Sequence, residues 1–444
     1  MYATKLALAV SLSFSLFNPI ASQASSLAAS VEQALPKLEQ LYLYLHQHPE
    51  LSYQEKHSSA RMAQELAALG FEVTDNFGGY GVVGMFKNGV GPTVMIRADT
   101  DGLPIIEQTG KPYASTATAL DANNNTVGIM HGCGHDIHMT SLIGTAAQLV
   151  AQKAQWQGTL MMVAQPAEEV GGGAKAMLKQ GLYSQFATPD AVLGLHVSAS
   201  IPAGKVGAVS GYALANVDSV DIKIKGRGGH GAYPHTTIDP VVLAARTVMA
   251  LQTIPSREIS PLEPNVVTVG SIHGGSKHNI ISNEVQLQLT LRSYNPEVRE
   301  QQIAAIKRIT KGIAMSAGLP DDLMPEVYVH ADQSIPSTYN NPELAAKVQA
   351  SIEAEIGQHN VQIAPPVMAG EDFGLYGRTA ENVPITLFWL GAVEPQLYAD
   401  SVTNGQTLPS LHSSKFAPDY PTTISTGVRA MTRAALDIFN SPNH

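Results

Sequence analysis

Three short apolar runs, residues 94–98, 159–164 and 191–195, alternate with helical patterns in the first half of the chain. Short runs without a polar face are typical of strands buried on both sides of a sheet. Strands and helices mixed in this way pack as layers, with helices covering the sheet. The sequence therefore predicts an α/β fold with a buried mixed sheet.

The pattern changes at about residue 215. Residues 217–225 alternate strictly, with Val220, Ile222 and Ile224 on one face and charged residues between them. The segments that follow have the order β-α-β-β-α-β, which is the ferredoxin-like arrangement. The α/β pattern returns after about residue 332. We expect one α/β domain, residues 25–214 and 333–444, interrupted by a ferredoxin-like lid domain at 215–332.

The N-terminus is typical of an export signal. Lys5 precedes an apolar run at residues 6–17, and Ser22 and Ala24 place small residues at the positions that a signal peptidase reads. We expect a signal peptide at 1–24 and a periplasmic or secreted product, although a buried helix start is the alternative. The net charge of −10 argues against nucleic-acid partners and, after processing, against anionic membranes.

Cys133 is the single cysteine of the chain, within the run HGCGHDIH at residues 131–138. It cannot form a disulfide within its own chain. A free cysteine is commonly a small buried hydrophobe. The adjacent histidines and glycines instead favour a thiolate ligand of a transition metal.

Other ligand types follow the apolar runs directly. Asp99 and Asp101 follow the first run, Glu168 and Glu169 the second, and His196 the third. Ligands of α/β sheets bind beyond the carboxyl ends of the strands, so we expect these side chains to converge. Of two adjacent glutamates, one can bind metal while the other acts on water. A solvated loop end is the alternative for such a pair.

The chain resembles the amidohydrolase branch of the aminoacylase and carboxypeptidase-G superfamily. That branch includes hippurate hydrolases, N-acyl-amino-acid amidohydrolases and plant auxin–amino-acid conjugate hydrolases. The resembling motifs lie at residues 45–52 (LHQHPELS), 97–104 (RADTDGLP), 131–138 (HGCGHDIH), 165–169 (QPAEE), 226–235 (GRGGHGAYPH), 274–281 (GGSKHNII), 370–373 (GEDF) and 412–416 (HSSKF). Two positions depart from the family pattern, namely Gly102 for a more usual alanine and Gly370 for a common serine.

The resemblance implies two divalent metal ions per subunit, zinc, manganese, nickel or cobalt. The implied ligands are Cys133, His135, Glu169, His196 and His412. Glu168 would be the general base, and His230, on the lid, would polarise the scissile carbonyl. Asn279 and Arg292 would bind the substrate carboxylate, and Asp101 and Asp136 would orient the ligands. The resemblance also implies a homodimer through the inserted domain, with His230 reaching the other subunit in related enzymes.

Some of these residues have ordinary alternatives. His412 lies in a loop, where a histidine is more often a surface residue. Arg292 could pair with a surface carboxylate, and Asn279 could be a turn residue. We do not assign His48, His131 or His138 as ligands.

We expect metal-dependent hydrolysis of the amide bond of N-acyl amino acids. A dipeptidase or carboxypeptidase on the same scaffold is the alternative within enzymes, and an exported metal-binding protein without catalysis is the alternative outside them. Glu168 distinguishes the last, because metal binding alone does not require it.

Overall fold

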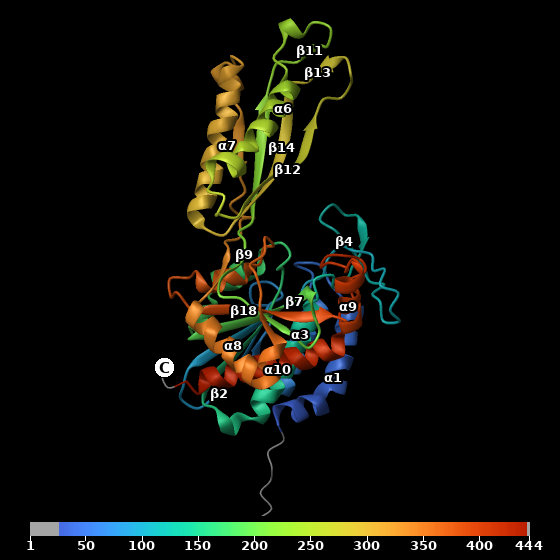
Figure 1. Cartoon of the computed structure of the whole chain (residues 1–444), viewed down its shortest axis with the longest axis vertical. Coiled ribbons are helices and arrows are strands. Elements are labelled where there is room, and N and C mark those ends of the chain that lie inside the picture. The colour runs from blue at the N-terminus through green and yellow to red at the C-terminus, as the bar shows by residue number, and fades with distance from the viewer. Residues whose placement is uncertain (1–25, 442–444) are drawn as a thin grey trace, which may run out of the picture.

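The computed structural model describes residues 26–441, which form two units connected by two segments of the chain (Figure 1). The predicted signal peptide lies outside the described residues. The larger unit contains an eight-stranded mixed sheet. Its strands have the order β1 (Glu72–Thr74), β2 (Val82–Asn88), β6 (Gly158–Gln165), β3 (Thr93–Asp99), β7 (Ala191–Pro202), β18 (Ile385–Val393), β8 (Val206–Ala208) and β17 (Val361–Ile363).

Helices cover both faces of this sheet. They are α1 (Leu27–Gln47), α2 (Lys56–Ala68), α3 (His135–Ala151), α4 (Gly173–Lys179), α5 (Leu182–Gln185), α8 (Pro342–Ile356), α9 (Pro395–Asn404) and α10 (Tyr420–Phe439). Along β3, Val94 and Ile96 enter a core with α1, α3 and α10, whereas Met95 enters a second core with α4. Both faces are therefore buried, which explains the apolar runs and confirms the predicted α/β class.

Strand pairing places the ends of several strands at one edge. β2 and β3 are joined by a short connection but do not pair, because β6 lies between them. β6, β3, β7 and β18 are all parallel to their neighbours in that series. Their carboxyl ends therefore meet at a single edge, where the sequence predicts the site.

The smaller unit spans residues 218–329 and has the predicted β-α-β-β-α-β order. Its elements are β10 (Asp218–Lys225), α6 (Pro240–Leu251), β12 (Asn265–Gly274), β14 (Glu284–Ser293), α7 (Pro296–Ser316) and β15 (Glu326–Val329). The sheet order is β12-β14-β10-β15, with antiparallel pairs. Burial alternates along β10 because α6 and α7 cover one face only.

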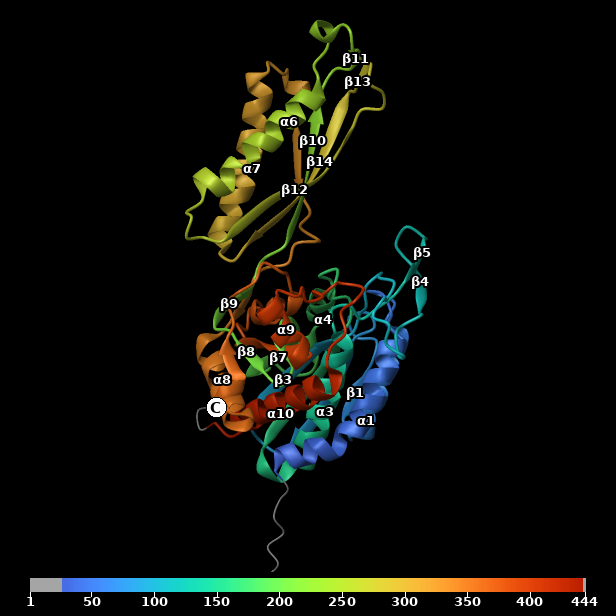
Figure 2. The same ribbon diagram turned by 45° about the vertical axis from the view of Figure 1, so that its right-hand side comes forward.

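Two very short strands that are distant in the chain, β11 (Gly229–His230) and β13 (Ile280–Ile281), pair antiparallel and form the tip of the smaller unit. Figures 1 and 2 both show this tip at the end farthest from the large sheet. The chain passes between the units beside β9 (Gly211–Leu214) and β16 (Thr338–Asn340), which pair with each other. Within residues 26–441, every helix is too short or too polar to cross a membrane.

Candidate metal centre

Five side chains from four segments meet at the carboxyl edge of the large sheet. The Cys133 sulfur lies 3.6 Å from His196 Nε2 and 3.3 Å from His412 Nε2. Two groups of donor atoms, each within 4.8 Å, share this sulfur: Cys133 with His135 and His196, and Cys133 with Glu169 and His412. The structure thus brings together all five residues that the resemblance implies as ligands. They form two sets that share the Cys133 thiol.

A glycine makes the approach of Cys133 and His135 possible. Gly134 has φ +77°, and a Cβ there would lie 2.5 Å from Val197 Cγ2. A larger residue would therefore face both backbone strain and a clash with β7. His135 begins α3 directly after this turn.

The donor atoms fit a divalent cation. His135 Nε2 and Glu169 Oε1 are buried without a hydrogen-bond partner among the described residues, 3.8 Å apart. His135 Nδ1 lies 2.8 Å from the carbonyl oxygen of Asp101, which can only accept, so the neutral ring presents its lone pair at Nε2. His196 Nδ1 likewise donates to the Val197 carbonyl at 2.8 Å. Metal-binding histidines in proteins are held in this way.

The ionisable groups of the cluster also favour a bound cation. Burial, Glu169 and Glu168 raise the pKa of the Cys133 thiol well above its ordinary value. Burial also raises the pKa of Glu169, to about 7, although His135 lowers it. A bound metal ion reverses such shifts, because it stabilises the thiolate and the carboxylate.

Asp101 holds the segment that carries the two glutamates. Ala167, with φ +51°, turns the chain after β6. The Asp101 carboxylate then accepts hydrogen bonds from the Glu168 and Glu169 amides, at 3.2 and 3.0 Å, and from the Ser52 hydroxyl at 2.7 Å. Left-handed backbone at a non-glycine residue is typical of functional sites.

Glu168 lies beside the cluster without belonging to either set around Cys133. Its carboxylate is 3.9 Å from His135 Nε2. Burial, Glu371 and Glu169 raise its pKa well above the ordinary value. A carboxyl group in such an environment can accept and return a proton near neutral pH, as a general base must.

A buried charge network behind Glu168 was not assigned from the sequence. Arg97 Nη1 lies 2.7 Å from Asp99, and Arg97 Nη2 lies 2.9 Å from Glu371 and 3.0 Å from Asp372. Glu168, Glu371 and Asp372 form another group of close carboxylates. A charged residue inside the apolar strand β3 was the signal that could have indicated this network.

His138 is buried next to the cluster, but both of its nitrogens are occupied. Nδ1 lies 2.6 Å from Asp99 Oδ1, and Nε2 accepts the Val197 amide at 2.9 Å. Neither ring nitrogen of His138 therefore has a lone pair free to bind a metal ion, so His138 is not counted among the candidate ligands. Asp99 itself lies 3.7 Å from His135 Nε2.

Asp136 does not contact the candidate ligands as the resemblance implies. Its carboxylate lies 2.7 Å from His46 Nδ1, and among residues 26–441 it has no hydrogen bond to any of the five side chains. His46 in turn contacts Glu107 at 3.2 Å. Asp136 therefore connects the start of α3 to His46 of α1 and, through His46, to the segment that contains Glu107.

The residues expected on the lid are not all near the cluster. His230 and Asn279 lie together at the exposed tip, where the Gly231 amide donates to the Asn279 carbonyl at 2.8 Å (Figure 2). Neither belongs to a group of metal-ligating atoms in the described chain. Within a single chain in this arrangement, the predicted contact of these two residues with the site is absent.

Arg292, on β14, lies at the other end of the smaller unit. Its Nη1 is buried and has no hydrogen bond among the described residues, and it lies 3.5 Å from the position of a Cβ on Gly370. The alternative, a surface ion pair, is not seen within residues 26–441. A Cβ on Gly370 would lie 2.2 Å from Val217 Cγ2, so the serine common in the family would not fit here without a shift of Val217.

Comparisons with known proteins find relatives over most of the chain. The model of "Peptidase family M20/M25/M40" matches residues 95–434. "Thermostable carboxypeptidase 1" of Saccharolobus solfataricus is 35% identical over 84% of this chain and 88% of that relative. "N-acetylcysteine deacetylase" of Bacillus subtilis is 34% identical over 78% and 86%. "IAA-amino acid hydrolase ILR1-like 2" of Arabidopsis thaliana is 35% identical over 77% and 73%.

Solved structures are similar over nearly the whole chain. A putative aminohydrolase from methicillin-resistant Staphylococcus aureus has a TM-score of 0.80 and 31% identity, covering 93% of this chain and 99% of that one. A Bacillus subtilis protein described as a dinuclear metal binding peptidase from the M20 family has a TM-score of 0.74 and 28% identity, with coverage of 92% and 99%.

Proposed function

The chain belongs to peptidase family M20/M25/M40, and on that premise we propose that it hydrolyses the amide bond of N-acyl amino acids to a carboxylic acid and a free amino acid. One observation carries the proposal. Five metal-type donors converge, and the carboxylate of Glu168 lies beside them outside both sets that share Cys133. Relatives named as deacetylases of N-acetylated amino acids and as a hydrolase of an IAA–amino acid support this substrate class.

The cluster would hold two divalent ions. Cys133 would be shared, with His135 and His196 on one side and Glu169 and His412 on the other. Ions bound there would supply Lewis-acid chemistry that polarises the scissile carbonyl and acidifies water. Sulfur, nitrogen and carboxylate donors together suit zinc, and manganese, nickel and cobalt are the other candidates.

Glu168 would move the proton. Its carboxylate takes a proton from the attacking water and returns it to the amide nitrogen, which leaves as the amine. Burial, Glu371 and Glu169 raise the pKa of Glu168, which favours holding the proton until it is returned. Asp101 holds the Glu168 amide, and thus the direction of the side chain.

The smaller unit would complete the site. His230 would stabilise the developing oxyanion, while Asn279 and Arg292 would hold the substrate carboxylate. Because His230 and Asn279 lie at the exposed tip, they need either closure of the unit or a second copy of the chain. We propose a homodimer through the smaller unit, in which the tip of one subunit enters the site of the other.

We also propose export, with residues 1–24 removed. The support is the basic residue, apolar run and Ser22-Gln23-Ala24 sequence at the N-terminus. N-terminal sequencing of the protein from a periplasmic or culture fraction should begin at Ser25. Recovery of the protein only from the cytoplasm, with the apolar run intact, would contradict export.

Peptide hydrolysis is the second candidate, because two relatives are named carboxypeptidases. The deciding experiment is a panel assayed with metal-loaded protein: hippurate, N-acetyl amino acids, aryl-acetyl amino acids and dipeptides. We expect the best N-acyl amino acid to exceed the best dipeptide in kcat/KM by at least about 10-fold. The reverse order would make the protein a peptidase, and metal binding without any turnover would favour a non-catalytic role.

A further inference from the structure

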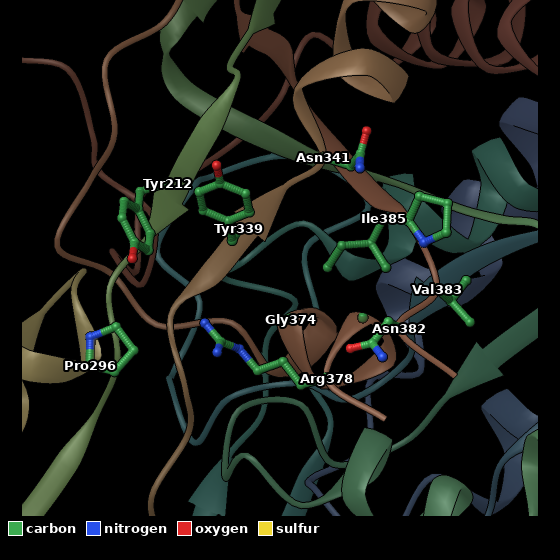
Figure 3. A pocket seen from close by; sticks show the side chains of 11 residues that line it. Tyr212, Pro296, Tyr339, Asn341, Gly374, Arg378, Asn382, Val383 and Ile385 are labelled. Carbon is green, nitrogen blue, oxygen red and sulfur yellow. The ribbon is translucent and has the colours of Figure 1, made fainter. Parts of the chain in front are cut away.

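A cavity of about 460 Å³ lies where the two units join, apart from the metal centre (Figure 3). Its walls include Tyr212, Pro296, Tyr339, Asn341 and Arg378. None of its lining residues is a candidate ligand or Glu168. Pro296 is the first residue of α7 in the smaller unit, whereas Arg378 and Asn341 belong to the larger unit, so the cavity has walls from both.

Arg378 supplies a positive charge without a carboxylate partner. Its Nε and Nη2 donate to the Ser337 carbonyl at 3.2 and 2.8 Å, and Nη2 also lies 2.9 Å from the Ser337 hydroxyl. Nη1 has no hydrogen bond to the described residues, and no carboxylate among them lies within ion-pair distance of Arg378. Figure 3 shows the side chain extending across the cavity toward Pro296. Nη1 of the guanidinium can therefore donate hydrogen bonds to an anion.

Two tyrosines provide flat apolar surface beside this charge. Tyr339 meets Tyr212 edge to face, with 5.0 Å between ring centroids, and Tyr212 is stacked on Tyr294. Tyr339 is 44% exposed although it is a large aromatic residue of a strand. An aromatic wall that is held rigid but left uncovered suits a planar ligand.

The surrounding backbone adds to the preference for an anion. α7 begins at Pro296 and α8 follows its cap Asn341, so the positive ends of both helices border the cavity. Glu297 and Glu343 lie in the first turns and offset part of this effect, but neither lines the cavity. The guanidinium of Arg378 is therefore the main source of the preference.

We propose that this cavity is a second ligand site, which binds a planar organic monocarboxylate through Arg378 and the ring of Tyr339. A ligand that touches Pro296 and Arg378 together favours one orientation of the smaller unit over others, because its contacts depend on that orientation. The aryl carboxylic acid released by hydrolysis belongs to this class, and this identification alone rests on the proposed function. Product could then regulate closure of the unit from outside the metal centre.

The test is calorimetric titration of the full chain with benzoate after removal of metal by a chelator, so that the metal centre cannot bind the carboxylate. We expect saturable binding, weakened at least about 10-fold in Arg378→Gln and unchanged in the control Arg257→Gln, which removes an exposed arginine elsewhere. Benzamide, the neutral isostere, should bind at least about 10-fold more weakly than benzoate. No binding, or equal binding in Arg378→Gln, would overturn the proposal.

A second variant covers the case in which loss of the bonds to Ser337 unfolds Arg378→Gln. Tyr339→Leu leaves those bonds intact and should also weaken benzoate at least about 10-fold, whereas unchanged affinity would contradict the site. Saturating benzoate should slow amide hydrogen exchange in the connecting segments 211–217 and 330–340, and unaltered exchange would refute the effect on orientation. Neither measurement involves turnover, so both outcomes are independent of the proposed reaction.

Discussion

The Cys133 sulfur lies 3.3 Å from His412 Nε2, although 279 positions separate these residues in the chain. On its other side the same sulfur lies 3.6 Å from His196 Nε2. Burial and two glutamates oppose its ionisation in the absence of a cation. A buried thiol surrounded by histidines and carboxylates gives little stability by itself. The proposed pair of metal ions, with the sulfur shared between them, would account for its position.

Replacement of this thiol tests its shared position. Cys133→Ser keeps the size of the side chain but offers a weak neutral ligand to both sets. We expect the metal content to fall from about two equivalents per chain to below one, measured by elemental analysis after dialysis against a chelator buffer. Ser198→Ala, on the same strand as His196, serves as the control and should retain its metal. Full metal content in Cys133→Ser would exclude a bridging role.

Much of the site could be predicted from the sequence, for reasons visible in the fold. Asp101 and Glu168 follow strands that the apolar runs reveal, whereas His196 lies within β7, which continues beyond its apolar run. The parallel arrangement of these strands brings the three residues together. His412 lies in a loop with φ +63°, and only the family resemblance indicated it. The position of His230 depends on how the two units are oriented, which local patterns do not determine. Two partners of Arg97, Glu371 and Asp372, lie 274 and 275 positions away in the chain, so local patterns do not predict their contact with it.

Asp101→Asn tests how the two glutamates are held. The amide nitrogen introduced by this change cannot accept a hydrogen bond, so either the Glu169 amide or the Glu168 amide loses its acceptor. We expect kcat/KM to fall by about 10- to 100-fold, with the metal content measured in parallel. Ser52→Ala removes only the hydrogen bond from the Ser52 hydroxyl to Asp101, and it should lower kcat/KM by less. Equal activities of the two variants would show that Asp101 does not position this segment.

The His46 pair gives a pH dependence of stability. Burial lowers the pKa of His46, but hydrogen bonds to Asp136 and Glu107 outweigh it and raise the pKa from 6.5 to about 9. Because the folded-state pKa lies above the unfolded one, the stabilising contribution is fully present below about pH 6.5. It is lost as pH rises through about 9, and it amounts to on the order of 3 kcal/mol.

We therefore expect the free energy of unfolding of the wild type to exceed that of His46→Gln by more at pH 6 than at pH 10. Urea denaturation at both pH values measures this difference. Titration of the metal ligands changes the free energy of unfolding of both proteins equally, so it cancels in the difference between them. A difference that stays constant or grows toward pH 10 would show that His46 is neutral in the folded protein.

The proposed dimer makes a prediction about mixed variants. If His230 enters the site of the partner, Glu168→Ala and His230→Ala are each inactive alone, yet a mixed dimer contains one complete site. After subunit exchange of equal amounts, about a quarter of the wild-type activity should return, since about half of the dimers are mixed. Activity that stays at the level of the separate variants would place His230 in its own subunit or outside the reaction.

The rate of N-acyl amino acid hydrolysis by metal-loaded Glu168→Gln tests the role of Glu168 as the general base. Glu168 lies beside the two donor sets but is not needed to complete either of them. We expect metal content equal to that of the wild type and a loss of kcat of at least about 100-fold, as the removal of a general base requires. Wild-type turnover by this variant, with both metal sites filled, would contradict the assignment of Glu168 as the base.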